Sequence, residues 1–132
     1  MEDYRDGFVL ILAGYDNEMK QLINSNPGIF SRIKHYMWFQ NYSIQELQQI
    51  FVHMANEGNF CVDETALLRF AERMKIEQGR QNFGNARSVR NCLEKAIDKH
   101  AVNIMNHILD KSKTYMICGE DIDITVKEHD FL

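Results

Sequence analysis

Proline, cysteine and long apolar runs are all scarce in this sequence. Its 132 residues include one proline and three cysteines, Cys61, Cys92 and Cys118, with no CxxC pair. An odd number of widely spaced cysteines is more typical of free thiols in a reducing cytoplasm than of a disulfide framework. No apolar run is long enough to span a bilayer and no signal peptide is recognisable, so we expect a cytoplasmic protein without a membrane partner.

Excess positive charge and metal-ligand clusters are scarce as well. The formal net charge is −4, which argues against the global basic field that recruits nucleic acid. The five histidines are scattered and have no acidic or thiol partners at ligand spacing, so we expect no metal site. The chain is 45% hydrophobic, which is enough for the core of one compact domain, or of one small domain plus a piece of another.

The motifs of ATP hydrolysis are also missing. The sequence has no G-x-x-x-x-G-K-[ST] loop, the element that cradles nucleotide phosphates. It has no acidic pair directly after an apolar strand either, because Glu2-Asp3 precedes one instead. We therefore expect this chain to be inactive in ATP hydrolysis when it is alone.

The most informative feature that is present is a pair of arginines, Arg87 and Arg90, in the run NARSVRN. Spaced three apart, they share one face near the N-terminus of a predicted helix. The helix dipole favours anions at that end, so two cations there call for an explanation. An anionic ligand such as a nucleotide phosphate would supply one. The alternative is a pair of solvated surface arginines.

The chain before residue 42 predicts two strands and one short helix. Phe8–Ala13 is apolar on both faces, like a central strand of a parallel sheet covered by helices. A helix from about Asp16 to Asn24 follows, and then a loop that contains Pro27. His35–Phe39 is the second strand candidate.

After residue 42 the periodicity is helical. The run SIQE at 43–46 is a capping box that opens a helix ending near Gly58. An extended stretch at 59–62 leads to Asp63, a good N-cap for a helix that stops near Gly79. A third helix is predicted from about Ala86 to Leu109, which completes a small bundle. A short strand or an edge segment is predicted in the tail by apolar residues that alternate with charged ones: Ile122, Ile124 and Val126.

Four segments in register resemble the second half of an AAA+ ATPase. They are residues 8–15, 26–33, 41–43 and 83–91, and the resemblance is to the branch that contains the red-type Rubisco activase and stage V sporulation protein K. It covers roughly residues 1–109 and implies a fold that is mostly α with a few strands. Residues 1–41 would be the C-terminal end of the AAA+ α/β P-loop nucleotide-binding core, with two strands. Residues 42–132 would be the AAA+ helical lid domain with a C-terminal tail.

The resemblance also implies site residues. Arg32, which follows the Asn-Pro-Gly turn, matches the arginine finger that acts in trans on ATP bound by the neighbouring subunit. Arg87 matches the sensor 2 arginine, which contacts nucleotide bound to its own subunit. Arg90 could assist it or pair with Glu94 at the (i, i+4) spacing, and we favour the ion pair.

The position of sensor 1 is less well matched. AAA+ proteins usually carry Asn or Thr there, whereas the candidates in this chain are Tyr15 and Asn17. The family implies a longer parent protein that assembles as a hexamer, uses ATP and Mg, and remodels protein substrates. This chain alone, without the phosphate loop, is expected to bind neither.

A gap in the sheet is a further consequence of the resemblance. In the AAA+ strand order 5-1-4-3-2, the first strand lies between the fourth and the fifth, and only the last two would be present here. These segments could pair directly, stay mobile or pair with a second copy of the chain. We expect residues 1–40 to be rearranged or engaged in a strand-mediated dimer, and residues 43–109 to be the stable unit. The alternative of another class is a stand-alone helical protein-interaction module without nucleotide chemistry.

Overall fold

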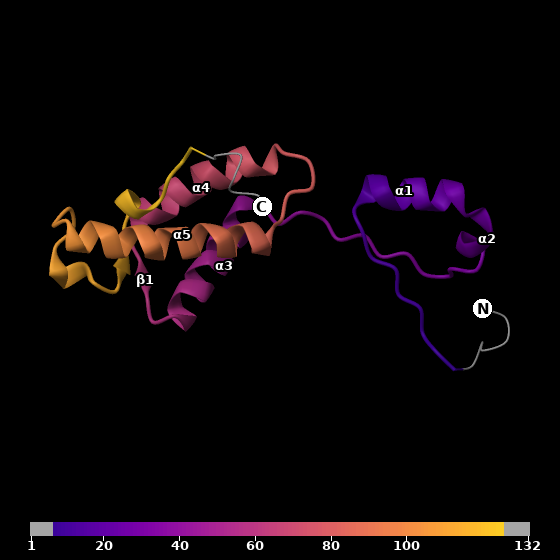
Figure 1. Cartoon of the computed structure of the whole chain (residues 1–132), viewed down its shortest axis with the longest axis horizontal. Helices are drawn as coiled ribbons and strands as arrows, with labels where there is room; N and C mark the ends of the chain where they lie inside the picture. Colours follow the sequence, from indigo (N-terminus) through magenta and orange to yellow (C-terminus); the bar gives the residue numbers. More distant parts are fainter. Residues whose placement is uncertain (1–6, 126–132) are drawn as a thin grey trace. The chain divides into compact units, whose positions relative to one another are not determined.

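The computed structural model describes residues 7–125 of the chain. The chain divides into two compact units, the N-terminal unit (residues 1–39) and the C-terminal unit (residues 40–132) (Figure 1). Helices dominate the described residues, which contain one small sheet of two parallel strands. The predicted fold class, mostly α with a few strands, is therefore confirmed.

Two short helices form the regular part of the N-terminal unit. The first, α1 (Asp16–Ser25), carries acidic residues in its first turn, where they complement the helix dipole. The second, α2 (Pro27–Phe30), has Pro27 in its first turn, where a backbone N–H has no partner within the helix. The helix predicted from Asp16 is confirmed, and Phe30 is buried.

Neither strand predicted in this unit is formed. Residues 8–13 and 35–39 have no regular secondary structure, and many of their apolar side chains are exposed. Val9 is 85% exposed and Phe39 is 92% exposed. A strand needs a hydrogen-bonded neighbour, and the described part of the chain offers none to either segment. Both strand predictions are therefore wrong for this chain, and the strand-mediated dimer stays a prediction.

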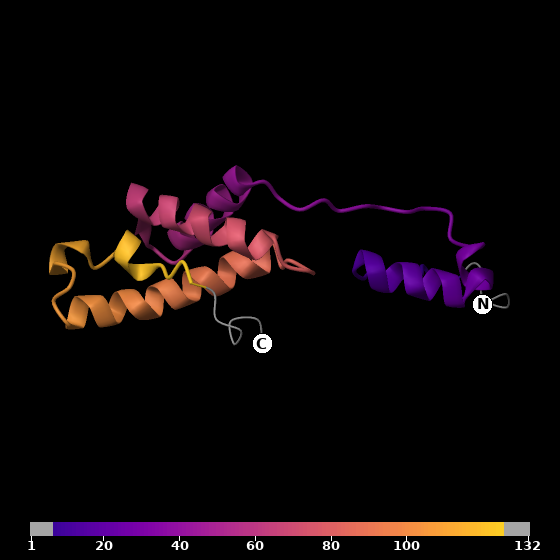
Figure 2. The same cartoon turned by 90° about the horizontal axis from the view of Figure 1, so that it is seen from above.

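Three helices form most of the C-terminal unit: α3 (Ile44–Glu57), α4 (Glu64–Gln78) and α5 (Ala86–Met105). Figure 2 shows them packed together, and α3 contacts both α4 and α5. The three helices are those that the sequence predicts. Within residues 7–125, none of the helices combines the length and the apolar character that a membrane crossing requires.

Local capping explains where two of these helices begin. The predicted capping box is present at the start of α3, where Ser43 Oγ accepts from the Glu46 N–H at 3.2 Å and the Ser43 N–H donates to Glu46 Oε2 at 2.8 Å. The Ser43 N–H, with a smaller contribution from the Ser43 side chain, donates to the Glu46 carboxylate and so lowers the pKa of Glu46. Asp63 caps α4 by accepting from the Ala66 N–H at 2.8 Å. Each cap contributes about 1 kcal/mol to stability.

The third helix ends earlier than predicted, at Met105 instead of Leu109. His107 takes a left-handed φ of 57°. The N–H groups of Ile108 and Leu109 then turn back to the carbonyl oxygen of Asn103, at 2.9 and 3.2 Å. This arrangement closes the helix in the manner of a left-handed C-terminal cap. The predicted helix was too long because Leu109 is apolar and buried, like the core residues of the helix, although it lies beyond the end of α5.

The hydrophobic core lies between the three helices. Phe51 of α3 stacks on Phe70 of α4 with ring centroids 4.3 Å apart, and both side chains are fully buried. Full burial of such a side chain is worth about 1.5–3 kcal/mol. The buried apolar residues of this core are Leu47, Phe51, Ala55, Ala66, Phe70, Met74, Phe83, Val89, Cys92, Leu93, Ala96, Ile117 and Ile122.

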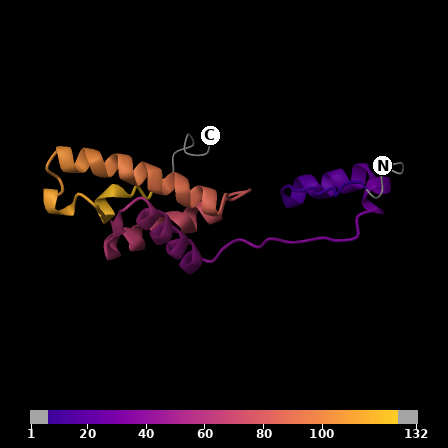
Figure 3. The same ribbon diagram turned by 90° about the horizontal axis from the view of Figure 1, so that it is seen from below.

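The C-terminal tail contributes a strand to this unit. β1 (Cys61–Val62) pairs in parallel with β2 (Met116–Ile117). Two 3-10 turns flank β2, η1 (Lys111–Lys113) and η2 (Gly119–Asp121). In Figure 3 the yellow segment that contains η2 runs along the helices, and η2 contacts both α4 and α5.

The position of the tail corrects two predictions. The strand predicted at Ile122 and Ile124 is wrong, because the strand lies earlier, at 116–117, and Val126 lies outside the described residues. Ile117 and Ile122 are buried in the common core. The compact unit therefore continues beyond residue 109, and the predicted stable unit of residues 43–109 is too short.

Candidate functional site

The loop before α5 makes a tight turn against the first turn of the helix. Asn82 and Asn85 both have positive φ values, of 57° and 49°, which mark a tight turn of the backbone on either side of Gly84. At Gly84, a Cβ atom would lie 2.8 Å from the Oγ of Ser88, which is buried. A larger residue at position 84 would displace Ser88, so the close approach of loop and helix requires glycine there.

Asn85 stands at the N-cap position of α5, yet its side chain makes no cap hydrogen bond. Instead, its amide holds the segment that leads into α3. Asn85 Oδ1 accepts from the Tyr42 N–H at 2.9 Å, and Asn85 Nδ2 donates to Asn41 Oδ1 at 2.8 Å. Gln78 Nε2 donates to the Tyr42 carbonyl oxygen at 2.8 Å. Both backbone polar groups of Tyr42 are therefore bound by side chains of the helical bundle.

Arg87 and Arg90 both lie on the exposed side of the start of α5. Their side chains are exposed, whereas Ser88 and Val89 between them are buried. Within residues 7–125, neither arginine takes part in an ion pair, so the predicted Arg90–Glu94 pair is not formed. Two guanidinium groups thus lie near the helix end that itself attracts anions, an arrangement suited to a phosphate.

The other predicted site residues belong to the N-terminal unit. Arg32 follows α2 in a turn in which its N–H donates to the Ile29 carbonyl oxygen at 3.1 Å, and its side chain is exposed. Tyr15 stands at the N-cap position of α1 and is exposed, and Asn17 is exposed in the first turn of the same helix. The roles of these three residues stay predictions.

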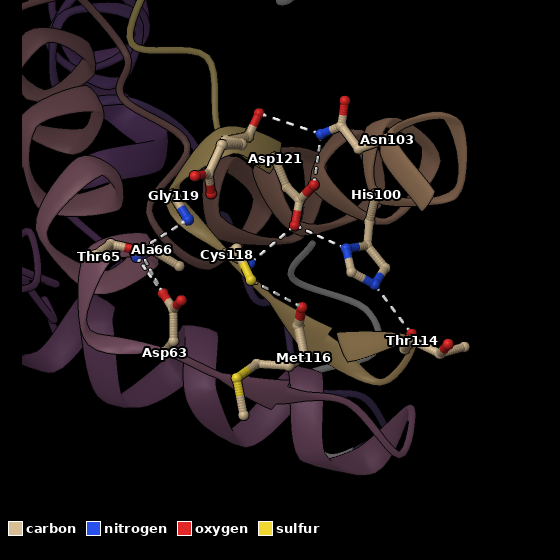
Figure 4. Close-up of polar contacts among 11 residues, drawn as sticks. Asp63, Thr65, Ala66, His100, Asn103, Thr114, Met116, Cys118, Gly119 and Asp121 are labelled. Atoms are coloured by element: carbon tan, nitrogen blue, oxygen red, sulfur yellow. Dashed lines mark hydrogen bonds and ion pairs between the residues drawn. The ribbon is translucent and has the colours of Figure 1, made fainter. Parts of the chain in front are cut away.

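A buried polar network lies near the other end of α5 (Figure 4) and was not predicted. His100 Nδ1 lies 2.8 Å from Asp121 Oδ2, and His100 Nε2 lies 2.9 Å from the Thr114 carbonyl oxygen. The Asp121 carboxylate and the Thr114 carbonyl oxygen thus hold the imidazole ring between them from its two nitrogen atoms. Asp121 also accepts from Asn103 Nδ2 at 2.7 Å and from the Cys118 N–H at 2.8 Å.

This network fastens the tail to α5. Asp121 follows Asn103 by 18 residues and His100 by 21 residues in the sequence, so no local sequence pattern predicts the network. The same tail is held to α4, because Arg73 Nη1 donates to the Asp123 carbonyl oxygen at 3.0 Å and the Gly119 N–H donates to Thr65 Oγ1 at 3.0 Å. Within residues 7–125, no group of three or more His, Cys, Asp and Glu side chains is arranged to hold a metal ion.

All three cysteines are free thiols, and two of them are buried. Burial raises the pKa of Cys92 to about 12. Burial, together with hydrogen bonding to Asp63, raises the pKa of Cys118 to about 11. Neither thiol is ionised near neutral pH, so neither is a candidate nucleophile. Cys61 is exposed.

The AAA lid domain family matches residues 43–130 of the chain, which covers most of the C-terminal unit. The chain belongs to the AAA lid domain family. The three helices α3 to α5, the parallel pair β1 and β2 and the buried network around Asp121 all lie inside the matched range. The part of the C-terminal unit from residue 43 on is hereafter the lid.

Curated relatives support the same assignment. Protein CbxX (chromosomal) of Cupriavidus necator is 39% identical over 106 residues, which covers 80% of this chain and 33% of that protein. Protein CbbX of Cereibacter sphaeroides is 40% identical over 96 residues, with 73% and 31% covered. The CfxQ homolog of Galdieria sulphuraria is 35% identical over 125 residues, with 92% and 41% covered.

The chain thus spans about a third to two fifths of the length of these relatives. Together with the lid match, they confirm the resemblance predicted from the sequence, to the C-terminal part of an AAA+ ATPase of the red-type Rubisco activase branch.

Proposed function

We propose that the chain is the sensor and lid part of an AAA+ ATPase whose parent binds and hydrolyses ATP as a ring in order to remodel protein substrates. The observation that carries this proposal is the exposed Arg87 at the start of α5, inside a segment that belongs to the AAA lid domain family. A lid that responds to nucleotide needs a cation on a rigid element. The buried turn of Ser88 and Val89 anchors that element in the core of the lid.

Arg87 acts as sensor 2 and contacts the phosphates of nucleotide bound to its own subunit. Its guanidinium is permanently charged and planar, so it can donate two parallel hydrogen bonds to phosphate oxygens. Arg90 lies one turn further along the same face and assists by adding positive charge. The absence of an ion pair for Arg90 within residues 7–125 supports this role over the pairing with Glu94.

Arg32 acts as the arginine finger and reaches ATP bound by the neighbouring subunit. Charge develops on the transferred phosphoryl oxygens during hydrolysis, and a guanidinium supplied in trans stabilises it. Support comes from its exposure in the turn after α2. Tyr15 and Asn17 at the start of α1 are the candidates for sensor 1, the residue that orients the attacking water.

Residues 1–41 form the end of the nucleotide-binding core and residues 42–132 form the lid with its tail. ATP and Mg are held by the phosphate loop of the parent's core, an element that is not among the residues of this chain. The exposed apolar side chains of residues 8–13 support the assignment, since a central strand of a parallel sheet is covered on both faces in a complete core.

The parent assembles as a hexamer and acts on a protein substrate in a reducing cytoplasm, where the three thiols stay free. A finger that acts in trans requires a ring or another arrangement that places one subunit's Arg32 beside its neighbour's nucleotide. Rubisco is one candidate for the protein substrate of the parent, because the branch contains the red-type Rubisco activase.

The lid role is tested by ATP turnover of the parent with Arg87→Ala. We expect kcat/KM for ATP to fall at least about tenfold, because a charge-assisted hydrogen bond to phosphate contributes about 1.5–3 kcal/mol. Lys75→Ala, which removes an exposed cation from α4, is the matched control and should keep full turnover. Full activity of the Arg87 variant would overturn the sensor 2 assignment.

The finger role is tested by Arg32→Ala in the parent. We expect kcat to fall by about a thousandfold, the lower end of what an arginine finger contributes in related chemistry. Mixing this variant with one that lacks a working phosphate loop should restore part of the turnover, because mixed rings place an intact finger beside an intact nucleotide site. Full activity of the Arg32 variant would refute the finger assignment, and an impaired variant that mixing does not restore would refute action in trans.

A further inference from the structure

We infer that Asn85 is a positioning residue, one that ties the segment leading into the lid to the helix that carries Arg87. This inference rests on the proposed function, because it concerns how the position of Arg87 is passed on to the rest of the chain. The observation behind it is that the side chain of Asn85 forms hydrogen bonds with Tyr42 and Asn41, which precede it in the sequence by 43 and 44 positions.

The contacts of Asn85 require an amide at this position. Its oxygen accepts the Tyr42 N–H, and its nitrogen donates both to Asn41 Oδ1 and to the Phe83 carbonyl oxygen at 3.3 Å. An amide of this length offers one acceptor and two donors at once, whereas a carboxylate offers acceptors only. Asn85 therefore fastens residues 41–42 to the loop that opens α5.

The backbone of Asn85 shows that this arrangement has a cost. Its φ of 49° and ψ of −118° lie in a region that glycine adopts freely and other residues adopt with strain. An asparagine at an N-cap normally stabilises its helix by accepting from the first turn, and Asn85 does not. Glycine would suit the backbone better, so the side chain's advantage at this position lies in its bonds to residues 41–42.

The connection is short on both sides. Arg87 follows Asn85 by two residues on the same first turn of α5, and Tyr42 directly precedes Ser43, which caps α3. Residues 41–42 continue the chain from the N-terminal unit, which ends at residue 39. When a phosphate draws Arg87 toward it, the start of α5 moves and the amide of Asn85 carries residues 41–42 with it.

The first test measures amide hydrogen exchange of Tyr42 in this chain. Asn85→Gly removes the amide while relieving the strained backbone, so the lid stays folded. We expect exchange at Tyr42 to become about tenfold faster, as for the loss of a hydrogen bond worth about 1.4 kcal/mol. Asn85→Asp keeps the acceptor and should retain the protection, and Asn91→Ala on the exposed side of α5 is the control. Unchanged exchange in Asn85→Gly would overturn the inference.

The second test measures ATP turnover of the parent. For Asn85→Gly we expect kcat to fall at least about fivefold, the lower end of typical coupling between sites. KM for ATP should stay within about twofold, because Arg87 is intact. If Asn85→Gly loses the protection of Tyr42 but keeps the kcat of the control Asn91→Ala, the coupling role is wrong. An impaired Arg87→Ala variant would then leave the proposed function standing. If Arg87→Ala is fully active, the proposed function fails, and the inference fails with it.

Discussion

The N-terminal unit and the lid differ in the solvent exposure of their apolar side chains. In the N-terminal unit, Val9 and Phe39 are 85% and 92% exposed. In the lid, Phe51 and Phe70 are fully buried and stack on each other. The run around Val9 is more apolar than the sequence around Phe70, which has Arg69 beside it, so local composition does not explain the difference.

The difference lies in where the required partners are found. A helix satisfies its own backbone hydrogen bonds, and an amphipathic helix needs only a neighbouring apolar face to become stable. Three such helices lie within residues 44–105. A strand needs a neighbouring strand for its backbone and covering layers for its side chains. The described residues supply neither to residues 8–13.

The largest expected effect comes from a matched pair of phenylalanines. Phe51→Ala should lower the free energy of unfolding of the lid by about 3–5 kcal/mol, because it opens a cavity in a fully buried site. Phe39→Ala should change it by less than about 0.5 kcal/mol, because that side chain is exposed. Urea denaturation of this chain, followed by helical circular dichroism, measures both. Similar losses in the two variants would break the comparison.

A smaller effect is expected from the buried network that binds the tail. Asp121→Asn leaves His100 Nδ1 facing a neutral partner, and we expect a loss of about 1–3 kcal/mol in the free energy of unfolding. The control is Asp123→Asn, whose exposed carboxylate pairs with Lys99, and it should cost at most about 1 kcal/mol. Equal effects would mean that the tail is peripheral to the lid.

The smallest effect is expected from removing residues 1–39. Cys92 should remain unreactive toward a thiol reagent at pH 8.5 in the shortened chain, as in the whole chain, while Cys61 reacts quickly. Fast labelling of Cys92 in the shortened chain alone would show that the lid depends on the N-terminal unit.

The same thiol predicts a pH dependence. Because the pKa of Cys92 is raised to about 12 in the folded state, its contribution to stability is complete below the unfolded value near 9 and is lost as the pH rises toward 12. Compared with Cys92→Ala, the chain should therefore lose stability more steeply with pH above about 9. Parallel pH profiles would contradict the raised pKa.

Several features of the lid could be predicted because they depend on neighbours in sequence. The capping box joins Ser43 and Glu46, and the cap of α4 joins Asp63 and Ala66, each three residues apart. The periodicity of apolar residues then gives the faces of the helices. The resemblance to AAA+ proteins rests on short motifs of the same kind, and α5 begins at Ala86, where the sequence predicts the start of a helix.

Other features could not be predicted because their partners are distant. The strand at 116–117 exists only because Cys61–Val62 lies beside it. Leu109 looks like part of a helix because it is apolar, yet it is buried by a turn at His107. Asn85 directly precedes the helix predicted from about Ala86, and only the folded chain brings Tyr42 within reach of its side chain.

The sequence by itself determined the three helices, the caps of α3 and α4, the family and the place of Arg87 in the first turn of α5, because each of these depends on residue types within one or two turns. The tertiary structure decided the course of the tail, the pairing of His100 with Asp121 and the hold of Asn85 on residues 41–42. These contacts join segments 21 to 44 residues apart, and only the packing of the core fixes which distant groups meet.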